Sequence, residues 1–595
     1  MASPQEPQVE TAGPLRRLLR QVSGLGRRAL DEADRPGRAT WLYVALLAVI
    51  EFGWRGGTES VHISLAYDAL HLGLMSVASL STWATLVSPA RTLRGRGGVD
   101  LLFFMASLLL LAVASLRAAG LVVILRTVMV STLQVTHRSG GARVLHWLMA
   151  RPASALVVSF LGTIFAGTVL LLTPSATAEH VVKFPLVALF TATSAVCVTG
   201  LTVVDPGTYY SRFGQWVILI LIQVGGLGII TLTSGVAVMM RERLAGRAGV
   251  AVQEMLEARN AGELRGLLVT IVASTVLCEG LGAVGLFPAM TVDPSGAPLL
   301  GPDRVFYAVF HSVSAYCNAG FALYADGFVR FSSSWLVNGV TMALIFLGGL
   351  GASVFMDLVR APWRHGPRHA WDFLSVHTRL VLTTSTALVL VGAAALCVLE
   401  GGHGWRDRRW DEVLLIGLFQ SVSLRTAGFA TVDLATLGPP ALLVCLFLML
   451  VGGSPGGMAG GVKTTSLAVI LLAVRAAIRG RPRAEVFGRT IPTGQVHRAI
   501  TVVTLSLGLL WALTVLLMLA EPAVPFLALA FEAVSAFATV GYTLNLTPTL
   551  SDGGQTVLVA MMFMGRLGPF TLALALGGTR RAAPVEYPEG RVQVG

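Results

Sequence analysis

The feature that most constrains this chain is a series of apolar segments long enough to cross a lipid bilayer. A spanning α-helix needs about 20 mostly apolar residues. Further apolar segments between residues 40 and 133 have less distinct boundaries. Because 54% of the 595 residues are hydrophobic and only 13% are charged, the sequence indicates a helical integral membrane protein. From residue 152 onward, spanning windows lie at 155–173, 215–240, 266–288, 333–358, 379–399, 440–475, 498–519 and 553–578.

The positive charge follows the expected topology of a membrane protein. The net charge of +12 comes largely from arginines in the short segments between apolar windows, which is typical of cytoplasmic loops. These segments lack the interleaved aromatic residues that stack nucleic-acid bases, so no nucleic-acid partner is expected. Residues 1–38 are polar and basic without the apolar core of a signal peptide. We expect a multi-pass protein among the lipids of the plasma membrane, with both termini in the cytoplasm.

Four shorter, semi-polar stretches lie between paired spanning windows and are too short to cross the membrane. Each begins with Phe, carries a Ser at a matched position and reaches a Gly, although the third is one residue shorter. Four such matches form an internal repeat. Glycines that merely allow close helix packing would not require this pattern. The stretches are FTATSAVCVTGL (190–201), FHSVSAYCNAGF (310–321), FQSVSLRTAGF (419–429) and FEAVSAFATVGY (531–542).

The repeat predicts the architecture of the chain. Irregular backbone at membrane depth is tolerated only where it is buried or lines a cavity. Four segments that each enter the membrane part way can therefore surround one axis. We expect an all-α membrane protein with four membrane–pore–membrane repeats around a central ion pore, plus extra N-terminal helices. The predicted parts are a basic cytoplasmic segment (1–38), extra transmembrane helices (39–150), repeat 1 (151–260), repeat 2 (261–370), repeat 3 (371–490) and repeat 4 with the C-terminal tail (491–595).

The aligned glycines indicate how such a pore would bind its ion. A dehydrated cation needs oxygen ligands, which a ring of backbone carbonyls supplies. Glycine adopts the unusual dihedral angles that aim successive carbonyls inward at little steric cost. Only the fourth loop, 539–542, approaches the TVGYG sequence of potassium channels. We predict a filter that binds K⁺ at backbone carbonyls of Val198, Thr199, Gly200, Asn318, Ala319, Gly320, Thr426, Ala427, Gly428, Thr539, Val540 and Gly541.

Two further features interrupt the spanning windows. The segment VGGSPGGMAGGVKTTS (451–466) holds six glycines and a proline, a density that cannot maintain a straight helix. Arg566 lies deep in the last window, where an arginine is costly and usually faces a cavity or a partner. From the residues alone, a simple helix kink and a structural ion pair remain the alternatives.

With these motifs, residues 150–595 resemble the superfamily of potassium transporters that includes KtrB, TrkH and HKT proteins, and KtrB in particular. The resemblance implies channel-like K⁺ uptake rather than enzyme activity, through one pore in each protomer of a homodimer. It also implies that the Gly-rich segment is an intramembrane gate beneath the filter, with Arg566 as an electrostatic barrier. The gate residues so implied are Gly452, Gly453, Gly456, Gly457, Gly460, Gly461, Lys463 and Arg566.

The resemblance further implies a regulatory partner. KtrB proteins work with a cytosolic octameric ring of nucleotide-binding KtrA subunits, so nucleotide is expected to act only through such a subunit. Activation by Na⁺ is left open. An alternative is a cation secondary transporter that uses the intramembrane carboxylates Glu279 and Glu532, while His311 is a further polar candidate. No nucleophile–base set or metal-ligand spacing supports a membrane enzyme.

Overall fold

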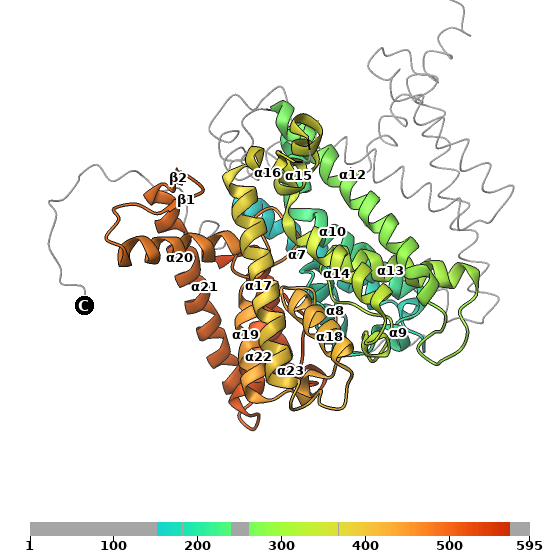
Figure 1. Cartoon of the computed structure of the whole chain (residues 1–595). Coiled ribbons are helices and arrows are strands. Elements are labelled where there is room, and N and C mark those ends of the chain that lie inside the picture. The colour runs from blue at the N-terminus through green and yellow to red at the C-terminus, as the bar shows by residue number, and fades with distance from the viewer. Residues whose placement is uncertain (1–151, 180–183, 240–260, 367, 570, 572–595) are drawn as a thin grey trace, which may run out of the picture. The chain divides into compact units, whose positions relative to one another are not determined.

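The computed structural model describes residues 152–179, 184–239, 261–366, 368–569 and 571, which Figure 1 draws as coloured ribbon. The predicted basic segment 1–38, the extra helices of 39–150 and the tail from 572 lie outside the described residues. The described residues up to Leu172 and from Ala176 onward cluster into one compact unit. This unit contains all four predicted pore loops.

The described residues are predominantly helical, which confirms the predicted all-α class. The long and medium helices are α7 (Pro152–Leu171), α8 (Pro185–Val196), α10 (Arg212–Met239), α12 (Ala261–Leu286), α13 (Gly301–Tyr316), α14 (Trp335–Leu350), α15 (Ala352–His365), α17 (Val376–Glu400), α18 (Trp410–Ser423), α19 (Pro439–Leu450), α20 (Thr464–Ile478), α21 (Thr493–Ala520), α22 (Phe526–Ala538) and α23 (Asp552–Leu567). The short helices are η4 (Pro174–Ala176), α9 (Pro206–Tyr209), η5 (Phe287–Ala289), η6 (Val329–Phe331), α16 (Ala370–Phe373), η7 (Leu434–Thr436) and η8 (Thr547–Thr549). The strands β1 (Glu485–Val486) and β2 (Arg489–Thr490) pair antiparallel between α20 and α21.

Several predicted spanning windows correspond to single helices with clear start signals. Among the described residues, Thr270–Ala289, α17 and α21 are long and apolar enough to cross a membrane. The hydroxyl of Ser375 accepts a hydrogen bond from the Thr378 amide at the start of α17, and Ser551 caps α23 in the same way. Such capping satisfies a backbone donor that the helix itself cannot pair.

Two windows are broken rather than continuous. The window 333–358 is not one straight helix, because the chain bends by 102° between α14 and α15. The break falls at Gly351, whose φ of +87° favours glycine. A Cβ atom there would also lie 2.6 Å from the Pro455 carbonyl oxygen. The window 440–475 is interrupted between α19 and α20, as its glycine content predicts.

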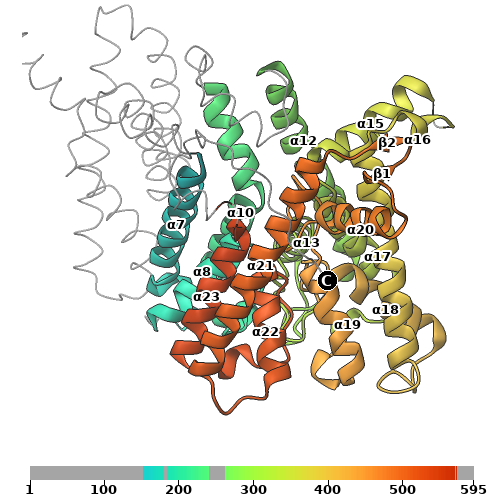
Figure 2. The ribbon, with the colours of Figure 1, turned by 90° about the vertical axis from the view of Figure 1, so that its left-hand side faces the viewer.

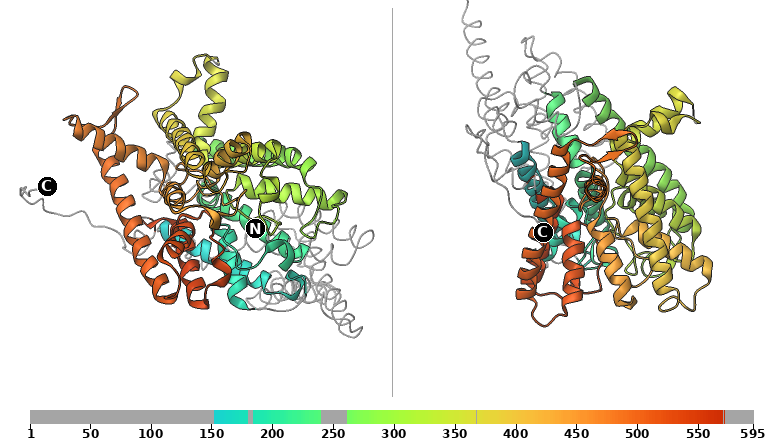
Figure 3. Two further views of the ribbon diagram at one scale, coloured as in Figure 1. Left: turned by 60° about the horizontal axis from the view of Figure 1, so that its bottom comes forward. Right: turned by 60° about the vertical axis from the view of Figure 1, so that its left-hand side comes forward.

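The helices pack in a cyclic order. Each of α8, α13 and α22 contacts the long helices on both sides of it in sequence, and α18 contacts α17, the helix before it. Helix α10 also contacts α13, α14 contacts α18, α19 contacts α22, and α23 returns to contact α8. Figure 2 shows α22 and α23 side by side, and Figure 3 shows the last, orange-to-red helices beside the first, teal ones. This order is consistent with four repeats around one axis, while the exact repeat boundaries remain predictions.

Most of the fully buried phenylalanines belong to the four aligned stretches. The leading Phe of each stretch is fully buried, and so is the large residue after each Gly. By contrast, outward-facing side chains such as Leu281, Val398 and Trp511 are mostly exposed, as suits helices in contact with lipid. The buried residues are Phe190, Phe310, Phe419 and Phe531 before the loops, and Leu201, Phe321, Phe429 and Tyr542 after the glycines.

Candidate ion pathway and gate

The four loops that follow α8, α13, α18 and α22 share one unusual backbone conformation. The residue two positions before each Gly has a positive φ: Val198 56°, Asn318 58°, Thr426 73° and Thr539 53°. The glycines follow at Gly200 90°, Gly320 70°, Gly428 76° and Gly541 97°. Positive φ at non-glycine residues is strained and clusters at functional sites. The same strain at four matched positions indicates a shared task.

The four glycines form a closed ring, which we call the glycine ring. A Cβ atom added to Gly200 would lie 2.5 Å from the carbonyl oxygen of Ala319, and one added to Gly320 would lie 2.7 Å from that of Ala427. The ring closes because each glycine faces the next loop and the last faces the first. In order, Gly200, Gly320, Gly428 and Gly541 face the carbonyls of Ala319, Ala427, Val540 and Thr199. Any larger residue would meet backbone that cannot move aside easily.

The matched serines hold the loops at the glycine ring. The hydroxyls of Ser194 and Ser535 accept hydrogen bonds from the amides of Gly200 and Gly541, at 3.1 and 3.2 Å. In the middle two loops the serine donates instead, to the carbonyl oxygen of the residue after the glycine. These bonds are Ser314 to Phe321 at 2.7 Å and Ser423 to Phe429 at 2.8 Å. The repeated serine is therefore a brace for the loop.

A second repeated brace was missed by the sequence reasoning. The residue after each leading Phe is polar and bonds to the segment beyond its glycine. His311 Nε2 accepts from the Leu323 amide at 3.1 Å, and Thr191 meets the Tyr210 hydroxyl at 3.0 Å. The other two bonds are Gln420 Nε2 to Thr431 Oγ1 at 3.2 Å and the Leu544 amide to Glu532 at 3.2 Å. A consistently polar column in the four aligned stretches was the available signal.

This brace assigns structural partners to two of the polar candidates. His311 Nδ1 lies 2.8 Å from the Tyr307 carbonyl oxygen, so both ring nitrogens are engaged. Glu532 accepts from the Thr547 hydroxyl at 2.8 Å as well as from the Leu544 amide. Glu279 lies elsewhere, with its carboxylate 3.4 Å from the amide nitrogen of Gln223. Among the described residues, Glu279 and Glu532 share no hydrogen-bond partner.

A cavity of about 560 Å³ lies on one side of the glycine ring; we call it the vestibule. It is lined by the four glycines and by the segments that follow them, including Asp205, Asp326 and Asp433. Carboxylates in a cleft raise the local concentration of cations. The helices α8, α13, α18 and α22, which we call the pore helices, end just before the loops that form the ring, and such C-terminal ends carry partial negative charge. Both features favour a cation at the ring.

On the other side of the glycine ring lies the segment 451–463, which we call the gate loop. It folds back on itself, because the Gly452 amide donates to the Val462 carbonyl and the Val462 amide donates to the Leu450 carbonyl, each at 3.0 Å. Its middle is attached to α14 through bonds from the Ser454 and Met458 amides to the Gly349 and Gly348 carbonyls, each 3.0 Å long.

The glycines of the gate loop permit close approach to the four loops that form the glycine ring, which we call the filter loops. A Cβ atom at Gly452 would lie 3.1 Å from the methyl group of Thr426. One at Gly460 would lie 2.8 Å from the Ala538 carbonyl oxygen and would also meet the Thr539 hydroxyl. Gly456 and Gly461 have φ of +75° and +66°. Gly453 and Gly457 face Ala459 and the Gly349 carbonyl.

Predicted gate cations bind carbonyl oxygens of the gate loop. Arg566 Nη1 lies 2.5 Å from the Met458 carbonyl oxygen, and its Nη2 lies 3.1 Å from that of Gly225 on α10. Lys463 Nζ donates to the Ala459 carbonyl at 2.7 Å. In the described part of the chain, no carboxylate lies within ion-pair distance of Arg566. The structural ion pair left open by the sequence is therefore not observed there.

A third cation at the gate loop was not predicted. Arg425 lies in the third aligned stretch and is buried, and its Nη2 lies 3.3 Å from the Gly452 carbonyl oxygen. The available signal was a full positive charge inside a stretch expected to sit within the membrane, two residues before a predicted filter alanine.

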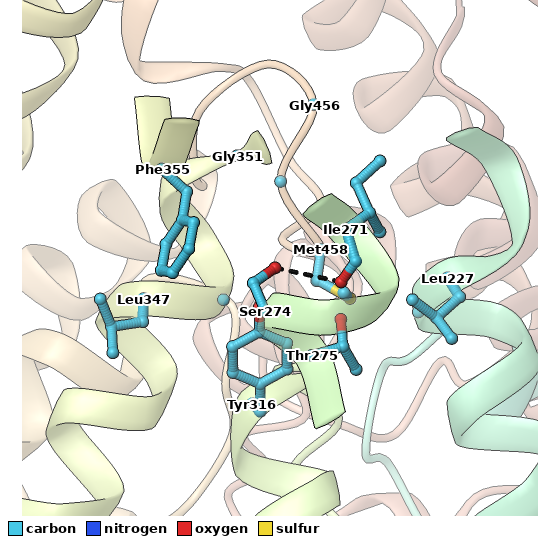
Figure 4. A pocket seen from close by; sticks show the side chains of 13 residues that line it. Leu227, Ile271, Ser274, Thr275, Tyr316, Leu347, Gly351, Phe355, Gly456 and Met458 are labelled. Carbon is cyan, nitrogen blue, oxygen red and sulfur yellow. Dashed lines mark hydrogen bonds between the residues drawn. The ribbon is translucent and has the colours of Figure 1, made fainter. Parts of the chain in front are cut away.

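A small cavity of about 30 Å³ is lined by the gate loop, by the bend at Gly351 and by residues of α12 and α13 (Figure 4). Figure 4 shows Ser274, Thr275 and Tyr316 close together, with Met458 of the gate loop beside them and Gly456 above. The Thr275 hydroxyl is buried without a hydrogen-bond partner. The space suits about one water molecule, which would satisfy that hydroxyl.

The chain is similar to known cation transport proteins. Residues 123–577 match the family model for TrkH, described as a cation transport protein. The chain is 36% identical over 449 residues to the Ktr system potassium uptake protein B of Vibrio alginolyticus, covering 74% of this chain and 94% of that protein. It is 33% identical over 416 residues to the potassium/sodium uptake protein NtpJ of Enterococcus hirae, covering 69% of this chain and 89% of that protein.

A solved structure shows the same fold. The potassium transporter TrkH from Vibrio parahaemolyticus superposes with a TM-score of 0.57 at 18% identity, covering 85% of this chain and 98% of that chain. The predicted superfamily is confirmed, and the relatives are transport proteins rather than enzymes. With its helical fold and the match over residues 123–577, the chain belongs to the TrkH family of cation transport proteins.

Proposed function

We propose that this chain takes up potassium ions by conducting dehydrated K⁺ through the glycine ring. The observation that carries the proposal is the closure of the ring, in which four glycines with positive φ each face a carbonyl of the next loop. Such a ring offers backbone oxygens from four sides and excludes side chains, as an ion without its water shell requires. The names of the Ktr and NtpJ relatives support K⁺ as the ion.

The proposed path has three stages. The acidic vestibule collects cations beside the ring, where the three aspartates line the cavity. The carbonyls of the residues around Gly200, Gly320, Gly428 and Gly541 then replace water ligands. Beyond the ring, the gate loop lies against Thr426 and Thr539 and would obstruct passage until it moves.

The gate loop and Arg566 together form the proposed gate. The loop has little side-chain volume to pack, so its position depends on backbone hydrogen bonds. Arg566 contributes one such bond to Met458 and also places a positive charge beneath the ring. That charge opposes a cation on the path, because like charges repel strongly away from water.

Regulation and assembly are also part of the proposal. We expect a cytosolic ring of nucleotide-binding subunits to shift the gate loop, and two copies of this chain to form a homodimer with one pore in each. The name of the Ktr system relatives fits a multi-subunit system. The potassium/sodium name of the NtpJ relative supports Na⁺ as a second ion, either transported or activating.

Replacing Gly320 by Ser tests the filter. The new side chain would meet backbone of the neighbouring loop, so we expect loss of K⁺ preference over Na⁺ in uptake by potassium-auxotrophic cells. Gly296→Ser is the matched control, because Gly296 has a φ of +86° but no atom within 4 Å of its Cβ position. Unchanged selectivity in Gly320→Ser, with normal protein in the membrane, would contradict the filter assignment.

The alternative, a carboxylate relay through Glu279 and Glu532, has less support. The Glu532 carboxylate accepts a hydrogen bond from Thr547 within its own repeat. The Glu279 carboxylate is bonded to Gln223 instead. Measuring proton-coupled uptake in Glu279→Gln distinguishes the two. Loss of coupling with an intact K⁺ preference would favour the relay.

A further inference from the structure

One position in the four aligned stretches differs sharply in size and charge. Three residues before the glycine, the other stretches carry a small side chain: Cys197, Cys317 or Ala538. The third stretch carries Arg425 there. Cys197 and Cys317 are the C-caps of their pore helices, whereas α18 ends one residue earlier relative to its glycine, with Leu424 as its C-cap. The shorter third stretch therefore releases Arg425 from the helix end.

Arg425 is a buried cation with no carboxylate partner in the described part of the chain. It is 8% exposed. Its Nη2 donates to the Ser385 hydroxyl at 3.2 Å and to the Gly452 carbonyl at 3.3 Å, and its Nη1 lies 3.4 Å from the Ser385 carbonyl. Its Nε is buried without a hydrogen-bond partner. A charge so placed is costly in a membrane protein and marks a functional position by default.

Arg425 lies where three parts of the molecule meet: the second loop of the glycine ring, the end of α14 and the gate loop. A cavity of about 10 Å³ is lined by Arg425, by Asn318 of the second filter loop, by Gly349 before the α14–α15 bend and by Gly453 of the gate loop. Ser385 lies on α17, the helix that begins the third repeat. Arg425 therefore lies between the filter loops and the first residues of the gate loop.

Arg425 and Arg566 hold different parts of the gate loop. Arg425 bonds to the Gly452 carbonyl near its start, and Arg566 bonds to the Met458 carbonyl near its middle. The third repeat is also the repeat whose second spanning window is interrupted by this loop. A long cationic side chain at the filter of that same repeat can reach the loop, which the small residues of the other repeats could not.

We propose that Arg425 is a positioning residue that latches the gate loop to the third filter loop. Its guanidinium bridges Ser385 and the Gly452 carbonyl, so the loop stays closed while that bridge is intact. Movement of Gly452 breaks the bridge and leaves the charge facing the adjoining cavity. The inference rests on the proposed gate, because a latch has meaning only if the loop obstructs the path.

The test compares Arg425→Gln and Arg425→Lys with the unaltered chain, by K⁺ flux into proteoliposomes without a regulatory subunit. Arg425→Gln loses the charged donor to Gly452, so basal flux rises about tenfold, the scale of one hydrogen bond to a charged donor. Arg425→Lys keeps the charge but not the planar fork, and it gives a smaller rise. Arg304→Gln is the matched control, because Arg304 also donates to two carbonyls but these hydrogen bonds are exposed to solvent; the flux of this variant stays unchanged.

A shortened loop lacking residues 456–459 separates the latch from the gate. In that background, Arg425→Gln produces no further rise, because its target no longer closes the path. If the shortened loop alone does not raise flux, the proposed gate is wrong. If the shortened loop raises flux but Arg425→Gln in the chain with the intact loop does not, only the latch is overturned. An equal rise with and without the loop also overturns the latch.

A milder variant distinguishes loss of the latch from a folding defect. Ser385→Ala removes one acceptor of Arg425 while the charge stays in place. If Arg425→Gln does not reach the membrane, Ser385→Ala and Arg425→Lys carry the same test: raised basal flux supports the latch, and flux at or below the unaltered level overturns it. A merely structural role would lower flux and the melting temperature together.

Discussion

The glycine ring and the gate loop face each other within the same protein and are built on opposite principles. The ring is made of four loops with matched positive φ angles and matched serine braces, although their side chains differ. The gate loop occurs once, in the third repeat, and contacts each neighbour differently. Repetition gives an ion oxygen ligands from all sides, whereas a single element can move without dismantling the ligand set.

The two regions also differ in what holds them. Each filter loop is fixed by buried aromatic side chains and by hydrogen bonds to its own pore helix. The gate loop is held by backbone bonds and by the cations Arg425, Arg566 and Lys463, with few apolar side chains to bury. Segments with little apolar burial open at low free-energy cost. The contrast predicts a rigid filter above a loop that opens locally.

The largest expected effect comes from breaking the ring. Gly541→Ala introduces a Cβ atom at a φ of +97° that would meet the Thr199 carbonyl, so K⁺ uptake falls to background. Gly339→Ala on α14 is the control, since nothing lies within 4 Å of that position. Uptake by potassium-auxotrophic cells measures the effect. Near-normal uptake in Gly541→Ala would show that the ring is not the conduction path.

A large increase in K⁺ flux, rather than a loss, is expected from a change at the proposed gate. Arg566→Gln loses the charged bond to Met458 and the positive charge beneath the ring, so basal K⁺ flux rises about tenfold. The K⁺ to Na⁺ ratio stays unchanged, because the ring is untouched. Arg409→Gln removes an exposed arginine that pairs with Asp411 and serves as control. A changed K⁺ to Na⁺ uptake ratio in Arg566→Gln would contradict the assignment of selectivity to the ring alone.

A moderate effect is expected where two filter loops are tied together. The Tyr542 hydroxyl lies 2.6 Å from the Phe429 carbonyl oxygen of the neighbouring loop and also meets Gln420. Tyr542→Phe should weaken the K⁺ preference about threefold to tenfold, since a net hydrogen bond contributes about 1 kcal/mol. Tyr324→Phe is the control. It removes a hydroxyl that donates to the Val292 carbonyl outside the ring, so the K⁺ preference stays the same. Competitive uptake of the two ions reports the difference.

The smallest effect concerns a single brace. Ser535→Ala removes the acceptor of the Gly541 amide, at a cost of about 1 kcal/mol, and lowers the melting temperature in detergent by a few degrees. Ser506→Ala loses only a bond to the Val502 carbonyl within α21 and changes less. Equal shifts in the two variants would mean that the matched serine has no special role in the ring.

Much of the candidate site could be predicted because its signals are local. Glycine at four matched positions, and a run of glycines within one window, follow directly from the residue types. The bend at Gly351 and the contact between Arg425 and the gate loop could not be predicted in the same way. The bend at Gly351 lies against the Pro455 carbonyl. Arg425 is bonded to the Gly452 carbonyl, 27 residues further along the chain. Neither partner is marked in the sequence.

By itself, the sequence determined that the chain is helical, spans a membrane and repeats one loop four times, because apolar length and glycine spacing act within a segment. Only the tertiary structure decided that Gly541 faces Thr199 and so closes the ring, and that Arg425 and Arg566 bind the same loop. These contacts join residues tens to hundreds of positions apart. Their partners are set by how the helices pack, which residue types alone do not specify.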